Sequence, residues 1–96
     1  MQRLTVAEIQ GRALPVLTRR HTRRAGVFGS AARGDMGPTS DIDLLVDLDP
    51  SLSLLDVIAL GHELEEALGR RVDLVEYDTI KPRIREQVLS EEVRIL

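Results

Sequence analysis

The sequence predicts an α/β (α+β) fold in which helices pack on a small mixed β-sheet. Segments with helical spacing of apolar residues alternate with short segments in which apolar and polar residues alternate, and aliphatic residues dominate the hydrophobic ones. The chain has 96 residues, too few to give each of two domains a core, so we expect a single domain over residues 1–96. Only 2% of the residues are aromatic, so this core is expected to be aliphatic.

The first predicted element is an amphipathic helix over residues 5–21. Thr5 and Glu8 have the spacing of a capping box, in which each side chain accepts a hydrogen bond from the backbone of the other residue. Apolar residues follow at helical spacing. Pro15 removes one backbone hydrogen bond, so we expect this helix to bend or split near Gly11.

Two predicted strands follow, separated by a short helix over residues 30–33 and a turn. The first strand is predicted at residues 25–28, directly after a run rich in arginine, and the second covers residues 40–49. Side chains alternate between the two faces of a strand. The second strand therefore has one apolar face, with Ile42, Leu44, Val46 and Leu48, and a second face with Asp41, Asp43, Leu45, Asp47 and Asp49.

The rest of the chain predicts a long helix, a strand and a final helix. Ser53 and Asp56 open the long helix, and Gly69 suits its C-terminal end. The third strand is expected over residues 71–77, and the last helix begins near Pro82, a favourable first helical residue. The predicted core stripe of the long helix comprises Leu54, Val57, Ile58, Gly61, Leu64 and Leu68.

The composition excludes several classes of function. The absence of cysteine excludes a disulfide scaffold, a zinc ribbon and a thiol nucleophile. With Phe28 and Tyr77 as the only aromatic residues, the chain cannot form a stacking platform for single-stranded nucleic acid, so we expect no direct nucleic-acid binding. No apolar stretch is long enough for a signal peptide or a membrane span, so we expect a cytoplasmic protein.

Charge is segregated along the chain. Residues 1–34 hold seven arginines and one glutamate, residues 35–66 hold nine acidic and no basic residues, and residues 67–96 are balanced. Both blocks can be solvated surfaces. Alternatively, the acidic block holds cations while the basic block binds an anion.

Asp41 and Asp43 share one face of a predicted strand, about 6 to 7 Å apart along the backbone. Their mutual repulsion calls for a positive partner, and a divalent ion such as Mg²⁺, which prefers carboxylate oxygens, meets this need. Asp73 is a third candidate ligand if its strand lies next to theirs. Such a pair also occurs on many solvated strands, so the spacing by itself decides nothing. An EF-hand is excluded because the required glycine and distal glutamate are missing.

Gly29 and Ser30 follow the first predicted strand directly. A glycine there lets a ligand approach the backbone closely, and a helix that starts at Ser30 points free N–H groups at an anion. A plain tight turn with a serine cap explains the same pair. The glycine patterns of P-loop and dinucleotide-binding proteins are absent. Phosphoryl and nucleotidyl transfer require at least a site that binds the phosphate anion and a cluster of carboxylates that binds a divalent cation.

The combined pattern closely resembles the DNA polymerase β-like nucleotidyltransferase superfamily. It consists of Gly29-Ser30, ten intervening residues that include Ala32-Arg33-Gly34, and then Asp41-Ile42-Asp43. Within this superfamily the chain is similar to the minimal nucleotidyltransferases (MNT), the antitoxin halves of HEPN/MNT toxin–antitoxin pairs. The resemblance extends from the first helix to the Arg71–Val75 segment, and it implies a nucleotidyltransferase-like fold.

The resemblance implies a role for each matching residue. Gly29 and Ser30 would hold the triphosphate of ATP, and Asp41 and Asp43 would ligate two Mg²⁺ ions. Asp73 matches the third carboxylate, which assists the second metal ion and activates the acceptor hydroxyl. Arg33 either contacts phosphate or forms a structural salt bridge. The predicted site therefore consists of the nucleotide-binding residues Gly29, Ser30 and Arg33 and the catalytic, metal-binding residues Asp41, Asp43 and Asp73.

The function implied by the resemblance is transfer of AMP from ATP to a hydroxyl, expected on a tyrosine, of a partner HEPN ribonuclease toxin. Because no residues are left for an acceptor-binding domain, the acceptor must come on its own scaffold, which predicts a hetero-oligomer of antitoxin and toxin. Two alternatives stay open: an antitoxin that neutralises by binding alone, and a small-molecule nucleotidyltransferase. We expect His21, His62 and Tyr77 to be structural or exposed residues.

Overall fold

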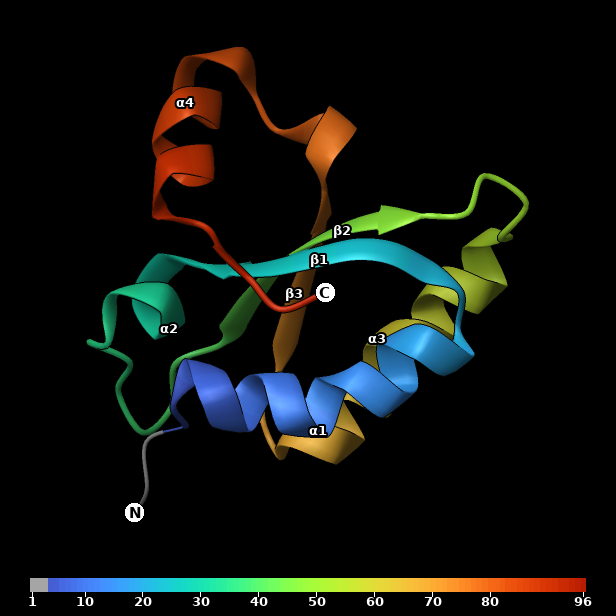
Figure 1. The fold of residues 1–96 in the computed structure, drawn as a ribbon, viewed down its shortest axis with the longest axis horizontal. Helices are drawn as coiled ribbons and strands as arrows, with labels where there is room; N and C mark the ends of the chain where they lie inside the picture. The colour runs from blue at the N-terminus through green and yellow to red at the C-terminus, as the bar shows by residue number, and fades with distance from the viewer. Residues whose placement is uncertain (1–3) are drawn as a thin grey trace.

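Strands β3, β2, β1 and β4 form one mixed sheet, in that order, in the computed structural model, which describes residues 4–96 (Figure 1). Helices pack on this sheet, which confirms the predicted fold class. Along the chain the elements are α1 (Val6–Arg19), β1 (Thr22–Phe28), α2 (Gly29–Arg33), β2 (Ile42–Leu48), α3 (Leu54–Leu68), β3 (Val72–Glu76), the 3₁₀ turn η1 (Tyr77–Thr79), α4 (Pro82–Glu91) and β4 (Val93–Arg94).

The sheet combines both kinds of strand pairing. β1 is antiparallel to β2 and to β4, whereas β2 and β3 are parallel and α3 connects them. A parallel pair requires such a crossover connection. In this register Asp43 of β2 lies opposite Phe28 on one side and opposite Asp73 on the other. Three neighbouring strands therefore present these residues in one row.

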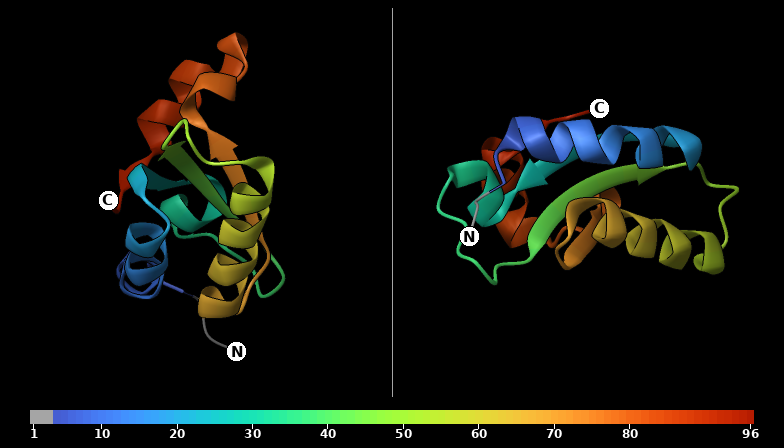
Figure 2. Two further views of the ribbon diagram at one scale, coloured as in Figure 1. Left: turned by 90° about the vertical axis from the view of Figure 1, so that its right-hand side faces the viewer. Right: turned by 90° about the horizontal axis from the view of Figure 1, so that it is seen from below.

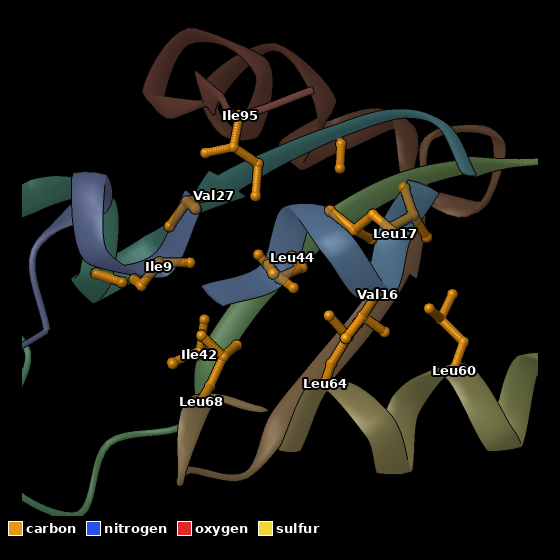
Figure 3. Packing of buried hydrophobic residues seen from close by; sticks show 14 of the residues in the cluster. Ile9, Val16, Leu17, Val27, Ile42, Leu44, Leu60, Leu64, Leu68 and Ile95 are labelled. Atoms are coloured by element: carbon orange, nitrogen blue, oxygen red, sulfur yellow. The ribbon is translucent and has the colours of Figure 1, made fainter. Parts of the chain in front are cut away.

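Helices α1 and α3 cover one face of the sheet, and α4 lies on the opposite side (Figures 1 and 2). Ile9 of α1, Leu44 of β2 and Leu64 of α3 are fully buried between these layers (Figure 3). Aliphatic side chains dominate this core, as the composition predicts. Leu45 is also fully buried although it shares the strand face of the aspartates, so that face is partly covered.

Helix α1 begins as predicted but continues differently. The Thr5 and Glu8 capping box is present. The expected split near Gly11 is wrong, because α1 is one uninterrupted helix with Pro15 inside it. Pro15 removes one N–H donor, and the buried face of the helix, with Ile9 and Leu17 fully buried, holds the segment on the sheet.

Strand β1 begins three residues before the predicted position, at Thr22. The prediction left Arg23 and Arg24 outside the sheet, but both lie in β1 and each has an ionic partner. Arg23 lies 3.0 Å from Asp47, and Arg24 lies 3.0 Å from Glu92. These partners allow charged residues to lie within a strand.

The basic and acidic blocks of the sequence pair with each other across α1 and α3. Arg19 and Arg20 both bind Glu63, the former at 2.9 Å. Hydrogen bonds from Arg20 and Arg19 lower the pKa of Glu63 to about 2. The segregated charges therefore form ion pairs within the fold, in addition to any role toward a partner.

Helix α3 has the predicted ends but a different buried face. The Ser53 and Asp56 capping box is present, and Gly69 closes the helix in a left-handed conformation. Leu60 is fully buried, whereas the predicted core residues Leu54 and Ile58 are 75% and 46% exposed. Helical spacing defines a stripe without fixing its direction, and the helix is rotated toward the row of Leu60, Leu64 and Leu68.

The last predicted helix is α4, which starts at Pro82 as expected and buries none of its residues completely. The short strand β4 after it lacks a sequence signal, because two residues cannot display an alternating pattern. None of the helices in residues 4–96 has the length and apolar character needed to span a membrane.

Replacement of the buried Leu64 by alanine should lower the free energy of unfolding by about 2 to 5 kcal/mol, because the cavity left behind is not refilled. Leu55→Ala, on the same helix at a position that is 77% exposed, is the matched control and should change it by less than about 0.5 kcal/mol. Urea unfolding followed by circular dichroism measures both variants. Equal losses would contradict the assignment of the core face of α3.

Candidate active site

The predicted aspartates gather on the sheet face opposite α1 and α3. Asp43 and Asp73 are register partners in the parallel β2–β3 pair, so their side chains project to the same side. Asp41 lies just before β2 and is exposed, as is Asp73, whereas Asp43 is half-buried. The structure therefore brings residues from two strands to one region of the surface.

Gly29 forms the other wall of this region. Its φ is +69°, a left-handed conformation that L side chains rarely adopt. A Cβ atom at Gly29 would lie 2.4 Å from Oδ2 of Asp43. The backbone at the end of β1 thus lies close to the Asp43 carboxylate, and a side chain at this position would displace that carboxylate. Ser30 follows in the five-residue helix α2 and is half-buried.

The carboxylates interact electrostatically. Burial raises the pKa of Asp43, and the charges of Asp73 and Asp41 raise it further, while Arg33 acts in the opposite direction. A bound cation would offset this repulsion. The donor set therefore fits Mg²⁺, which prefers hard oxygen ligands.

The metal ligands are not preassembled. Within residues 4–96, no three Asp, Glu or His side chains lie close enough together to hold a metal ion by themselves. Mg²⁺ commonly binds through one or two carboxylates while phosphate oxygens and water complete its shell. This mode agrees with a site in which the nucleotide contributes ligands. The assignment of Asp41, Asp43 and Asp73 as metal ligands stays a prediction.

Arg33 forms the salt bridges that were one of its two predicted roles. Its Nε lies 3.3 Å from Asp35 and its Nη1 lies 3.0 Å from Glu91 of α4. Hydrogen bonds to Asp35 and Glu91 raise the pKa of the guanidinium. The contact with Glu91 ties α2 to α4 across this side of the molecule.

Arg70 has a supporting role that sequence reasoning missed. Its Nη1 donates hydrogen bonds to the carbonyl oxygens of Gly37 and Ser40, both at 3.0 Å. These bonds fix the loop that leads into Asp41. In the sequence Arg70 stands in a balanced charged segment, and nothing local distinguishes it from a solvated arginine.

Two cavities open on the surface formed by residues 4–96. The larger, of about 440 Å³, is lined mainly by charged residues, among them Arg24, Asp47 and Glu92, and none of the six predicted site residues lines it. The smaller, of about 270 Å³, borders Asp73. Only the smaller one adjoins the predicted site.

Tyr77 is held within the fold, and the two histidines lie on the surface. The Tyr77 hydroxyl donates a hydrogen bond to Glu92, and Arg24 stacks over its ring at 4.4 Å from the centroid. Burial and the Glu92 carboxylate raise the pKa of Tyr77. His21 and His62 are exposed. These positions confirm the structural and exposed roles predicted for the three residues.

The chain belongs to the nucleotidyltransferase domain family, whose sequence pattern matches residues 13–95. It is 41% identical over 93 residues to a candidate protein adenylyltransferase of Methanocaldococcus jannaschii, covering 97% of this chain and all of that one. It is 47% identical over 73 residues to the protein adenylyltransferase MntA of Thermococcus cleftensis, covering 76% of this chain and 74% of MntA. The protein is therefore a nucleotidyltransferase enzyme.

Solved structures support the same assignment. A candidate minimal nucleotidyltransferase superposes with a TM-score of 0.77 at 43% identity, covering 88% of this chain and 86% of that one. The MNT antitoxin in complex with a tri-AMPylated HEPN toxin of Shewanella oneidensis shares the fold, with a TM-score of 0.68, 21% identity and 92% and 69% coverage. The resemblance to minimal nucleotidyltransferases drawn from the sequence is confirmed.

Gly29→Ala should destabilise the protein more than Gly69→Ala does. Both glycines have a φ of +69°, but a Cβ at Gly69 meets nothing within 4 Å. The backbone strain, about 1 to 2 kcal/mol, is therefore common to both variants, and only Gly29→Ala also displaces the Asp43 carboxylate. Urea unfolding compares the two free energies. If both variants lose the same free energy of unfolding, the Gly29 backbone and the Asp43 carboxylate are not in close contact.

Proposed function

We propose that this protein is a Mg²⁺-dependent adenylyltransferase that moves AMP from ATP to a tyrosine hydroxyl of a partner HEPN ribonuclease toxin and thereby acts as its antitoxin. The observation that carries the proposal is the position of Asp41, Asp43 and Asp73 beside the Gly29 backbone. A triphosphate and its cation require both features in one place.

Each site residue has a separate role in the proposed reaction. The backbone at Gly29 and the Ser30 hydroxyl would hold the triphosphate, and Asp41 and Asp43 would hold two Mg²⁺ ions. When bound, Mg²⁺ neutralises charge on the phosphates and on the departing pyrophosphate. Arg33 would add a contact to a phosphate, while its Nε and Nη1 atoms are engaged by Asp35 and Glu91.

Asp73 serves the acceptor. It is exposed and stands at the outer side of the row, so its carboxylate can accept the proton of an incoming hydroxyl. The hydroxyl oxygen then forms a bond to the α-phosphorus of ATP, the bond to the bridging oxygen breaks, and pyrophosphate leaves. AMP remains on the acceptor as a phosphodiester. The added negative charge and bulk would block a nearby ribonuclease centre.

The relatives support this acceptor class. MntA of Thermococcus cleftensis is a protein adenylyltransferase, and the Shewanella oneidensis complex contains an AMPylated HEPN toxin. We carry the partner class over to this chain as part of the proposal, together with a hetero-oligomer of antitoxin and toxin. The cytoplasmic location and the absence of direct nucleic-acid binding stay predictions.

Labelled AMP should pass from ATP to the toxin when the protein, Mg²⁺ and its cognate HEPN toxin are combined. Asp43→Asn should reduce this transfer at least about 100-fold, because the reacting phosphate loses its cation. Asp47→Asn is the matched control, since Asp47 lies on the same strand but is held by Arg23 at 3.0 Å. It should retain the activity of the unaltered protein.

The contrary result is neutralisation without transfer. If the unaltered protein labels no toxin while Asp43→Asn still neutralises it fully at equal molar amounts, the protein acts by binding alone. Labelling of a free aminoglycoside without any protein acceptor would instead favour the small-molecule transferase.

Removal of divalent ions should abolish transfer reversibly. A chelator in excess over Mg²⁺ leaves the carboxylates of Asp41 and Asp43 without the cation that offsets their repulsion. Readdition of Mg²⁺ should restore the original rate, and Ca²⁺ should restore less, because Mg²⁺ imposes a tighter octahedral geometry on the phosphates. Unchanged transfer in the chelator would exclude the proposed metal chemistry.

A further inference from the structure

The proposed binding of the triphosphate at Gly29 and Ser30 and of Mg²⁺ at Asp41 and Asp43 leaves the cavity of about 270 Å³ beside Asp73 unused. This cavity lies between the sheet and the segment that leads into α4, and its lining consists of Phe28, Asp73, Val75, Thr79, Ile80, Lys81, Ile84 and Val88. Pockets for whole drug-sized ligands have volumes of about 300 to 1,000 Å³. This cavity suits a smaller group, the size of one side chain.

The lining of this cavity is apolar except at Asp73, Thr79 and Lys81. Phe28, Val75 and the side chains from α4 provide a hydrocarbon surface, and the Thr79 hydroxyl donates its hydrogen to the Glu76 carbonyl at 2.9 Å. The carboxylate of Asp73 is the acceptor at the border with the predicted site. An occupant must therefore be largely apolar and carry a hydroxyl at one end.

Lys81 adds a positive charge to the lining. It is the sole lysine of the sequence and is exposed, and its ammonium group makes no hydrogen bond or ion pair with any residue between 4 and 96. An unpaired ammonium group at this position complements an acidic residue of an incoming chain.

We infer that this cavity is the acceptor subsite, and that it receives the ring of a partner-protein tyrosine that is flanked by an acidic residue. The inference rests on the proposed function and names where its acceptor binds. The ring lies against Phe28 and Ile84, the hydroxyl reaches Asp73, and Lys81 pairs with the flanking carboxylate. The hydroxyl of the tyrosine thereby gains a hydrogen-bond acceptor, and its ring is buried against apolar side chains.

The walls disfavour the adenine base as the occupant. Adenine presents ring nitrogens and an amino group along its edge, and these need hydrogen-bonding partners when they are buried. Of the lining residues, only Asp73, Thr79 and Lys81 have polar side chains, and the Thr79 hydroxyl already donates its hydrogen to the Glu76 carbonyl. A phenol ring has only its hydroxyl to satisfy, so this mostly apolar lining fits an aromatic hydroxyl better than a purine.

Methyl NMR of the protein loaded with Mg²⁺ and a non-transferable ATP analogue tests this assignment by titration with N-acetyl-Glu-Tyr-amide. The methyl signals of Ile80, Ile84 and Val88 should shift in a saturable way, and N-acetyl-Glu-Ser-amide should bind at least about 10-fold more weakly. Leu54 and Leu55, exposed on α3, provide the reference signals. Shifts of the cavity methyls by the ATP analogue alone, or equal binding of both dipeptides, would overturn the assignment.

A kinetic comparison separates this inference from the proposed function. Ile84→Ala should raise the KM for the toxin about 10-fold or more and leave nucleotide affinity unchanged. Leu55→Ala removes a similar side chain elsewhere and should change neither value. Ile84 is 42% exposed, so its removal spares the core. Absence of AMP transfer by the unaltered protein overturns the proposed function, whereas normal transfer with an unchanged KM in Ile84→Ala overturns only the acceptor subsite.

Discussion

The close approach of the Asp43 carboxylate to the Gly29 backbone is the constraint on which the site depends. It requires a residue without a side chain at the end of β1, in a conformation with positive φ, and it requires β2 to present an aspartate at the neighbouring register position. The parallel pairing of β2 with β3 then places Asp73 alongside. The contact between Gly29 and Asp43 thus places the proposed phosphate-binding turn next to the carboxylates that are proposed to bind the cation.

The fold keeps this crowded region in place by burying the other face of the same strands. Ile42 and Leu44, the neighbours of Asp43 along β2, are fully buried beneath α1 and α3. A shift of one residue in register would turn the aspartates into this core, which the burial of charge forbids. On the opposite face, the salt bridge from Arg33 to Glu91 connects α2 to α4, and the smaller cavity opens beside Asp73.

Local signals in the sequence predicted much of this arrangement. Thr5 and Ser53 mark the starts of two helices, and the alternation around Asp43 defines the two faces of its strand. The remaining features depend on residues distant in sequence. Strand β1 starts early because Arg23 and Arg24 find acidic partners far along the chain. Leu60 is buried because of the way α3 is rotated on the sheet. Arg70 has its role because it binds a loop thirty residues before it in the sequence.

The most direct measurement is a crystal structure of the protein with Mg²⁺ and a non-hydrolysable ATP analogue. We expect the triphosphate to lie against Gly29 and Ser30 and Mg²⁺ to bind at Asp41 and Asp43. A nucleotide bound instead in the charged cavity near Arg24 and Glu92, or bound without any cation at the aspartates, would contradict the account.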